Sequence, residues 1–411
     1  MSSQRRITKR GKGASTSSRR RTGANGDHQP SQTDCPICGE RGTSTGLVFQ
    51  TVFGSSHHFL SCQNCSFLFD PQSEEVRYDA GFYTDNPFLD LKLYIEKGAG
   101  FQLFSYLLTL CEKTLDLVRR PPSRRVGTRK LLEVGCGPAF LLDIARFSGW
   151  DATGIEPSPD AAQWGKETLG VSIIQDSLGD TSPIRGVDAI ITSEVIEHLH
   201  SPWRFAKAIA GALKPDGVLV LTTPNANSKM LSERGSSWSH LGMGYHFVLY
   251  SAHALEKVLR GVGFKDVQIW TFEGPYSDER LVAVATKRRL NPLLWEAIRR
   301  PLEGDKESFD RTHQYLWHTL RRFEKEKHSY WQGVFYRIVE SLNAAGHYNQ
   351  AVKMADKLEA FLVEQGHTEK SVMATLERAC RKNNRKAFYE TVPTFVPNLY
   401  FQRGLARLHT V

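Results

Sequence analysis

The chain has 411 residues, which is long enough for two or three domains that each bury an apolar core. No stretch approaches the roughly 20 uncharged apolar residues of a membrane-spanning helix, and the N-terminal residues lack the apolar segment of a secretion signal. We therefore expect a cytoplasmic protein without membrane contact. The seven cysteines include two closely spaced pairs, which indicates metal binding rather than a disulfide framework.

The net charge of +9 is concentrated at the N-terminus. Residues 1–33 hold eight Lys or Arg against one Asp, a net of +7, so the rest of the chain carries only +2. This segment is rich in Ser, Thr and Gly and shows no apolar periodicity, so we expect a disordered basic arm. A solvated tail is the default interpretation. Loose nucleic-acid contact through counterion release and an organelle transit peptide are the alternatives.

Residues 34–78 are predicted to form a zinc ribbon. Each Cys-x-x-Cys spacing lets two thiolates face one ion, and two such turns complete a tetrahedral site. Segments 46–50 and 58–61 have strand character and would form a hairpin between the turns. Four thiolates leave no open coordination position, so the zinc is expected to be structural. The predicted ligands are Cys35, Cys38, Cys62 and Cys65.

Residues 129–287 alternate between strand and helix patterns, which is typical of a parallel sheet covered on both faces. The expected strands are 130–134, 151–155, 171–174, 188–192, 217–222, 267–272 and 281–287. The expected helices begin near Pro138, Pro159, Pro202 and Ala252.

The first predicted strand leads into a glycine turn at 135–137, with Glu133 just before it. A dinucleotide-binding fingerprint would have a small residue where Phe140 stands, and this turn lacks the Gly-Lys-Ser/Thr of a P-loop. The next strand ends at a second acid, Glu156. Two acids in these positions suit a zwitterionic cofactor that carries a sugar, because a carboxylate accepts two hydrogen bonds from a cis-diol.

On these residues, segment 129–287 resembles the class I S-adenosylmethionine-dependent methyltransferases, within their ubiquinone-type O-methyltransferase branch. The resemblance implies a doubly wound, mostly parallel seven-stranded sheet that binds S-adenosylmethionine. Ala139 takes the place of the usual third glycine, which we expect to cost little. The matching motifs are 133–139, 154–158, 175–177, 193–199, 213–217 and 222–225. The implied cofactor-binding residues are Glu133, Gly135, Cys136, Gly137, Glu156, Asp176, Ser177 and Glu194.

A zinc ribbon in front of such a domain resembles a bacterial group whose members often methylate sugars or small metabolites. In that group the ribbon helps to cover the substrate side. The resemblance spans roughly residues 35–287, and its motifs specify the cofactor far better than the acceptor.

Glu194, Glu197 and His198 follow a predicted strand, at the sheet edge where functional groups of doubly wound folds gather, and His246 stands downstream. One hypothesis joins them in a Mg²⁺ or Mn²⁺ site similar to that of small-RNA 2′-O-methyltransferases. A second makes His198 the general base for an acceptor hydroxyl, with Glu197 beside it. A third limits Glu197 and His198 to positioning the next helix. The catalytic candidates are His198 and Glu197.

The remaining segments are predicted to be helical. Residues 79–128 are expected to form a linker whose helices cover the cofactor pocket, and residues 288–411 a helical region. Segment 345–351 resembles one tetratricopeptide helix junction, which alone makes no repeat array but leaves a protein partner open.

These observations predict a methyltransferase that acts at oxygen or carbon of a small metabolite or sugar. An alternative enzyme activity is metal-dependent 2′-O-methylation of RNA 3′ ends, favoured by the basic arm and disfavoured by the nearly neutral body of the chain. A third hypothesis is a cofactor-binding scaffold whose helical tail recruits proteins.

Overall fold

The structure of the chain is a computed structural model, and residues 1–32 of the predicted basic arm lie outside its described part. The described residues are 33–50, 56–73, 82, 91, 94–95, 100–119, 127–178, 184–238, 240–241, 246–272, 277–299, 305–323, 329–381 and 395–409.

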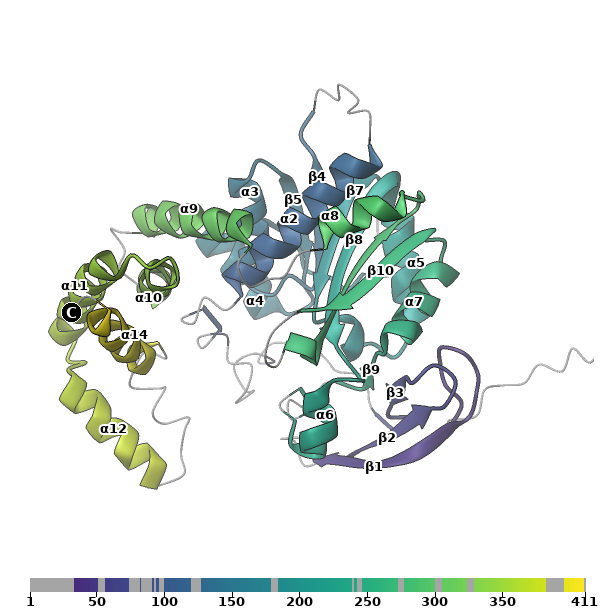
Figure 1. Cartoon of the computed structure of the whole chain (residues 1–411), viewed down its shortest axis with the longest axis horizontal. Coiled ribbons are helices and arrows are strands. Elements are labelled where there is room, and N and C mark those ends of the chain that lie inside the picture. Colours follow the sequence, from purple (N-terminus) through teal and green to yellow (C-terminus); the bar gives the residue numbers. More distant parts are fainter. Residues whose placement is uncertain are drawn as a thin grey trace, which may run out of the picture. The chain divides into compact units, whose positions relative to one another are not determined.

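The larger of the two sheets in the described part of the chain has seven strands (Figure 1). Its order is β10-β11-β8-β7-β4-β5-β6, and β11 alone among these strands runs antiparallel to its neighbours. This arrangement confirms the predicted doubly wound, mostly parallel α/β fold. The strands are β4 (Lys130–Val134), β5 (Asp151–Ile155), β6 (Ser172–Ile174), β7 (Val187–Ser193), β8 (Leu213–Pro224), β10 (Asp266–Thr271) and β11 (Arg280–Thr286).

Helices cover both faces of this sheet (Figure 1). Because side chains alternate along a strand, Ala189 and Ile191 of β7 enter one apolar cluster while Ile190 enters the other. The first cluster contains α2 (Phe101–Val118) and α3 (Phe140–Phe147), and the second contains α5 (Pro202–Ala212) and α7 (Ala252–Gly261).

Helix α2 is the main described element of the segment that the sequence predicts to cover the cofactor pocket. Leu107, Leu108 and Cys111 of α2 are fully buried in the cluster against the sheet. The helix therefore belongs to the domain core, because its apolar residues pack on β7 and β8 rather than over a pocket.

The ribbon forms a second sheet, with the order β1-β2-β3-β9. The predicted hairpin is present as β1 (Gly42–Gln50) and β2 (Ser56–Cys62), followed by β3 (Leu68–Phe69). The fourth strand, β9 (Val248–Leu249), comes from the methyltransferase-like segment, so the ribbon shares a sheet with that domain.

The described residues after β11 lie mostly in helices, as predicted for residues 288–411. Helix α9 is tied to the sheet domain, since Arg311 pairs with Glu112 of α2, and Tyr315 and Arg322 bond to Asp143 of α3. None of the described helices is long and apolar enough to cross a membrane. The helices of this region are α8 (Pro292–Ile298), α9 (Lys306–Phe323), α10 (Ser329–Ala344), α11 (Tyr348–Glu364), α12 (Glu369–Arg381) and α14 (Val396–Leu408).

Candidate cofactor and acceptor site

The predicted site residues gather at the carboxyl ends of the central strands. The chain proceeds from β4 outward to β5 and β6, and then crosses to β7 on the other side of β4. Such a reversal of strand order opens a crevice at the carboxyl edge, which is where doubly wound sheets bind ligands.

Neighbouring protein atoms and backbone conformation restrict which residues the glycine turn can hold. Gly135 has φ +71°, and a Cβ built on it would lie 2.4 Å from Cγ2 of Val195, so a side chain cannot fit. Gly137 also has positive φ, at +51°. Ala139 adopts φ +68°, where a Cβ costs about 1 kcal/mol, so the replacement of the third glycine carries a real penalty.

Glu133 and Glu156 are both buried at this edge, with 4% and 3% of their surfaces exposed. Oε2 of Glu156 accepts from the Gly137 N–H at 2.7 Å, and Oε1 accepts from the Ser158 N–H at 2.9 Å. Oε2 of Glu133 is buried without a hydrogen-bond partner among the described residues. Burial, followed by the charge of Glu156, raises the pKa of Glu133 well above its ordinary value, and burial also raises the pKa of Glu156.

The other predicted cofactor residues differ in their surroundings. The side chain of Cys136 is buried in the core and packs towards Gly154 of β5, so any contribution to the cofactor comes from its backbone. Asp176 and Ser177 follow β6 at an exposed position, where Oδ1 of Asp176 accepts from the Ser177 N–H at 2.7 Å.

Glu194 lies directly after β7, in a left-handed conformation with φ +56°. Its Oε1 accepts from the Thr222 hydroxyl at 3.1 Å, and its Oε2 lies 3.2 Å from Nε of Arg280. Glu194 therefore takes part in an ion pair with Arg280 at this edge, and it is not in the cluster formed by Glu197, His198 and His246.

Glu197, His198 and His246 converge at the same edge. One oxygen of Glu197, Oε1, lies 4.0 Å from Nε2 of His198 and 3.9 Å from Nε2 of His246, and it has no hydrogen-bond partner in the described part of the chain. The other oxygen accepts from the hydroxyl of Thr223 on β8 at 2.9 Å, so the side chain does not cap helix α5.

The surroundings of Glu197 and His246 favour their neutral forms. Burial, and then the charge of Glu194, raises the pKa of Glu197 well above its ordinary range. Burial, together with the neighbouring His198 and His240, lowers the pKa of His246 well below its ordinary value. The potential ligand atoms lie within 4.8 Å of one another, so they would have to move slightly closer to bind one metal ion through bonds of about 2.0–2.2 Å.

Two residues near the cluster were missed by the sequence analysis. The rings of His240 and His246 lie 6.0 Å apart, and Arg280 enters from the start of the antiparallel strand β11. Only the topology brings these two residues here, because no spacing in the sequence relates them to the motifs. Tyr94 belongs to the segment that the sequence predicts to cover the cofactor pocket; it stacks on Phe140 at 5.8 Å and lies within the electrostatic reach of Glu133 and Arg280.

The four ribbon cysteines form a compact cluster. Sγ of Cys35 lies 3.6 Å from Sγ of Cys65, and Sγ of Cys38 lies 3.4 Å from Cys62 and 3.8 Å from Cys65. A tetrahedron with Zn–S bonds of about 2.3 Å has edges of about 3.8 Å, so the four sulfurs are spaced for one zinc ion. Burial also raises the pKa of the Cys35 thiol to about 11, so metal binding would have to release its proton.

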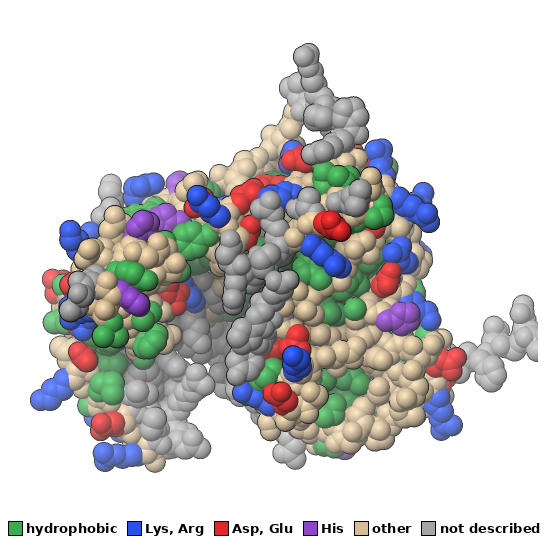
Figure 2. All heavy atoms as spheres, in the orientation of Figure 1, with side chains coloured by type: hydrophobic (Ala, Val, Ile, Leu, Met, Phe, Trp, Pro, Cys, Tyr) green, Lys and Arg blue, Asp and Glu red, His purple; other side chains and the backbone are tan. Residues whose placement is uncertain are grey.

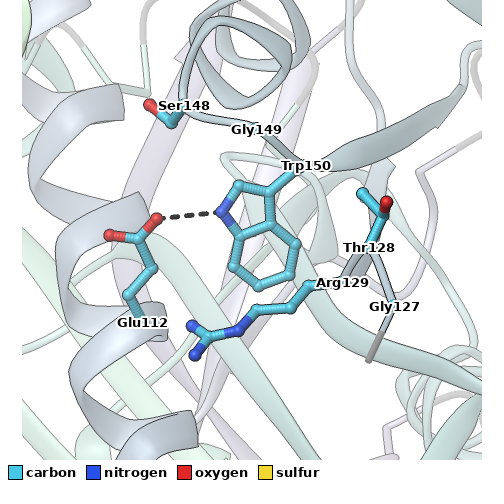
Figure 3. A pocket seen from close by; sticks show the side chains of 7 residues that line it. All are labelled: Glu112, Gly127, Thr128, Arg129, Ser148, Gly149 and Trp150. Carbon is cyan, nitrogen blue, oxygen red and sulfur yellow. Dashed lines mark hydrogen bonds between the residues drawn. The ribbon is translucent and has the colours of Figure 1, made fainter. Parts of the chain in front are cut away.

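A pocket of about 450 Å³ lies at the opposite, amino end of β4 and β5 (Figure 3). Figure 3 shows the indole of Trp150 between Glu112 of α2 and Arg129. The Trp150 Nε1–H donates to Oε1 of Glu112 at 2.9 Å, and the Arg129 guanidinium lies 5.9 Å from the ring centroid. Glu112 also pairs with Arg311, and Arg129 bonds to Asp116, so these polar groups already have partners in the protein and we place the functional site at the carboxyl edge instead.

Comparison with known proteins relates this domain to methyltransferases. Residues 103–269 match the family described as "Methyltransferase domain". An "Uncharacterized methyltransferase" of Mycobacterium sp. (strain JLS) is 31% identical over 113 residues, which cover 26% of this chain and 43% of that protein. The "Ubiquinone biosynthesis O-methyltransferase" of Bradyrhizobium diazoefficiens is 29% identical over 109 residues, covering 25% of this chain and 43% of that protein.

A solved structure that is similar to part of this chain is the TehB-like SAM-dependent methyltransferase from Corynebacterium glutamicum, with 19% identity and a TM-score of 0.30. The match covers 43% of this chain and 88% of that one. The chain spans less than half the length of the two curated relatives above. Residues 103–269 are thus similar to a methyltransferase domain, within the doubly wound sheet described above.

Proposed function

We propose that this chain transfers a methyl group from S-adenosylmethionine to an oxygen or carbon of a small metabolite or sugar. The observation that supports the proposal most strongly is that two sets of side chains lie at the same edge of the sheet. Two buried acids there suit the cofactor, and a Glu/His/His cluster beside them suits an acceptor. The names of the relatives, which include ubiquinone biosynthesis O-methyltransferases, support transfer to oxygen.

The acids fit the cofactor through their hydrogen-bonding capacity. Oε2 of Glu133 is a buried acceptor without a donor among the described residues, and the cofactor's ammonium group would supply one. Each oxygen of Glu156 accepts one backbone N–H and keeps a lone pair for a ribose hydroxyl. Both carboxyls have raised pKa values, and a cationic ligand would favour their ionised forms.

In methyl transfer, the side chains of the enzyme mainly align the methyl donor with the acceptor and exclude water. When bound, the cofactor supplies a methyl group on a positively charged sulfur, which is already activated. What this chain must add for a hydroxyl acceptor is a group that takes its proton. We assign that role to Nε2 of His198, which faces Glu197 at 4.0 Å and is better exposed than His246.

A divalent cation is a second way in which the same cluster could activate a hydroxyl, and a specific observation favours it. Oε1 of Glu197 is buried without a hydrogen-bond partner among the described residues, and Nε2 of His198 and Nε2 of His246 lie 4.0 Å and 3.9 Å from it, too far for hydrogen bonds. Two imidazoles and one carboxylate suit Mn²⁺ better than Mg²⁺, which prefers oxygen ligands. Bound to Glu197, His198 and His246, the ion would lower the pKa of an acceptor hydroxyl.

We also propose that the four-cysteine cluster of the ribbon holds structural zinc, which would make the chain a zinc-ribbon member of the ubiquinone-type branch. The sulfur spacing supports this assignment. RNA remains the alternative acceptor. On the face shown in Figure 2, Lys and Arg side chains are interspersed with Asp and Glu rather than gathered in one basic surface, which favours a small acceptor.

The test uses methyl-labelled S-adenosylmethionine, the purified protein and a fractionated cell extract, with and without Mn²⁺. The proposal predicts label in the small-molecule fraction. Label in RNA that depends on Mn²⁺ would reverse the choice of acceptor, and stimulation of small-molecule labelling by Mn²⁺ would favour the cation over His198 as the activating group. Cofactor binding without transfer to any fraction would support the scaffold hypothesis.

A further inference from the structure

The ribbon sheet holds the backbone that directly follows His246. Strand β3 pairs with β9, with Leu68 opposite Leu249 and Phe69 opposite Val248. The Asp70 N–H donates to the carbonyl of Phe247 at 2.9 Å. The residues that follow His246 are thus fixed by hydrogen bonds from the ribbon and not by the seven-stranded sheet alone.

A second connection starts at a zinc-ligand candidate. The hydroxyl of Ser251 donates to the carbonyl oxygen of Cys65 at 2.5 Å and accepts from the Ala254 N–H at 3.0 Å. Ser251 is buried, with 3% of its surface exposed, and it caps the N-terminus of α7. The end of the segment that carries His246 is therefore bonded to the second Cys-x-x-Cys turn.

A third connection joins the ribbon to Tyr250 through two aromatic rings. Phe67 packs edge-on against Tyr250 with the ring centroids 5.0 Å apart, and both side chains are fully buried. The Tyr250 hydroxyl is buried without a hydrogen-bond partner in the described part of the chain. Burial, and then the charge of Glu197, raises the pKa of Tyr250, which places this hydroxyl within electrostatic reach of that carboxylate.

The segment after His246 is also hydrogen-bonded directly to the Glu/His/His cluster. The Phe247 N–H donates to the carbonyl of Glu197 at 3.1 Å. By contrast, the backbone donors to the cofactor acid Glu156 come from Gly137 and Ser158, which belong to the loops after β4 and β5. The ribbon thus contacts the segment around the Glu/His/His cluster, while the donors to Glu156 come from the sheet domain.

We propose that the ribbon is a positioning element for acceptor activation: through β3, Cys65 and Phe67 it holds residues 246–251 so that His246 and Glu197 converge. Loss of the ribbon's order disturbs this cluster and leaves cofactor binding intact. The functional meaning of this coupling rests on the proposed role of the cluster, whereas the coupling itself can be measured without a turnover assay.

The experiment compares two variants of the full-length, zinc-replete protein. Phe67→Leu removes the ring that packs on Tyr250 and leaves the cysteines in place. Trp203→Phe is the matched control, because it removes another ribbon contact, the bond from Trp203 Nε1 to the Pro36 carbonyl at 2.9 Å, far along the chain from residues 246–251. Zinc content, hydrogen exchange of residues 246–251, and affinities for S-adenosylhomocysteine and Mn²⁺ are measured for each protein.

Phe67→Leu is expected to keep zinc, to bind S-adenosylhomocysteine within about twofold of the wild type, and to exchange at residues 246–251 about tenfold faster. Trp203→Phe is expected to leave the zinc content, the affinity for S-adenosylhomocysteine and the exchange of residues 246–251 unchanged. Extraction of zinc from the wild type with a chelator should reproduce the faster exchange, which covers the case in which Phe67→Leu fails to fold.

Unchanged exchange at residues 246–251 after zinc extraction would overturn the proposal, and so would a parallel loss of S-adenosylhomocysteine affinity, which would mean general unfolding. Faster exchange with intact cofactor affinity supports the coupling even if Mn²⁺ does not bind and no acceptor is methylated. That combination would contradict the proposed function and not the coupling.

Discussion

Replacement of Glu156 by Gln tests the cofactor assignment. The carboxylate is buried and accepts one backbone N–H on each oxygen, from Gly137 at 2.7 Å and from Ser158 at 2.9 Å. An amide has one acceptor oxygen, so one of these donors would face an NH₂ group and lose its partner. We expect this to cost about 1–3 kcal/mol of folding free energy. Loss of charge-assisted bonds to the ribose should cost roughly 1.5–3 kcal/mol of binding, or about 10- to 150-fold in Kd.

The assay is calorimetric titration with S-adenosylmethionine, with thermal unfolding measured on the same samples. Glu167→Gln serves as the control, because Glu167 is exposed and its described hydrogen bond is to the side chain of Gln163, four residues earlier. The control should leave Kd unchanged. If Glu156→Gln lowers the unfolding temperature but binds the cofactor as tightly as the wild type, then Glu156 only holds the loops together, and the assignment to the ribose is wrong.

Three further predictions concern the ribbon, the cofactor edge and the helical region. Cys38→Ser should release about one zinc per chain and disorder the ribbon; unchanged zinc content by atomic emission would contradict the four-cysteine site. The raised pKa of Glu133 means that the folded, cofactor-free protein loses stability as pH rises above the ordinary value of 4.5, so the stability of Glu133→Gln relative to the wild type should increase as pH rises above that value. A gain in unfolding temperature independent of pH would argue against this origin. Arg311→Ala removes the partner of Glu112 in a pair whose side chains are 14% and 20% exposed, and should cost about 2 kcal/mol, less than a fully buried pair. Arg260→Ala, which breaks an exposed pair with Glu256 on one helix, should cost under about 0.5 kcal/mol. Urea titration measures the free energy of unfolding of both variants, and equal costs would contradict the expected difference between the part-buried pair and the exposed pair.

The sheet was largely predictable from the sequence because its signals are local. Strands β4 and β5 have the predicted bounds, since each is a short buried segment that ends at a turn or an acid. Strand β9 could not be predicted, because two residues carry no periodicity and their partner β3 lies far away in the chain. The role of α2 was missed because an apolar helix has the same pattern whether it covers a pocket or packs on a sheet.

The candidate site was predictable to the extent that its residues sit in motifs. The acids at the ends of β4 and β5 lie together at the carboxyl edge, and Glu197 and His198 meet His246. The pairing of Glu194 with Arg280 could not be foreseen, because it depends on β11 running antiparallel and placing its first residue at that edge. His240 joins through a loop whose path no pattern specifies.

The most direct test of the account is whether the carboxyl edge binds S-adenosylmethionine rather than another adenine cofactor. The measurement is calorimetric titration of the purified, zinc-replete chain with S-adenosylhomocysteine, and with NAD⁺ as a matched control that shares the adenosine portion. The account predicts one S-adenosylhomocysteine bound per chain and no measurable heat with NAD⁺. Binding of NAD⁺ without S-adenosylhomocysteine would contradict the assignment of the glycine turn, Glu133 and Glu156.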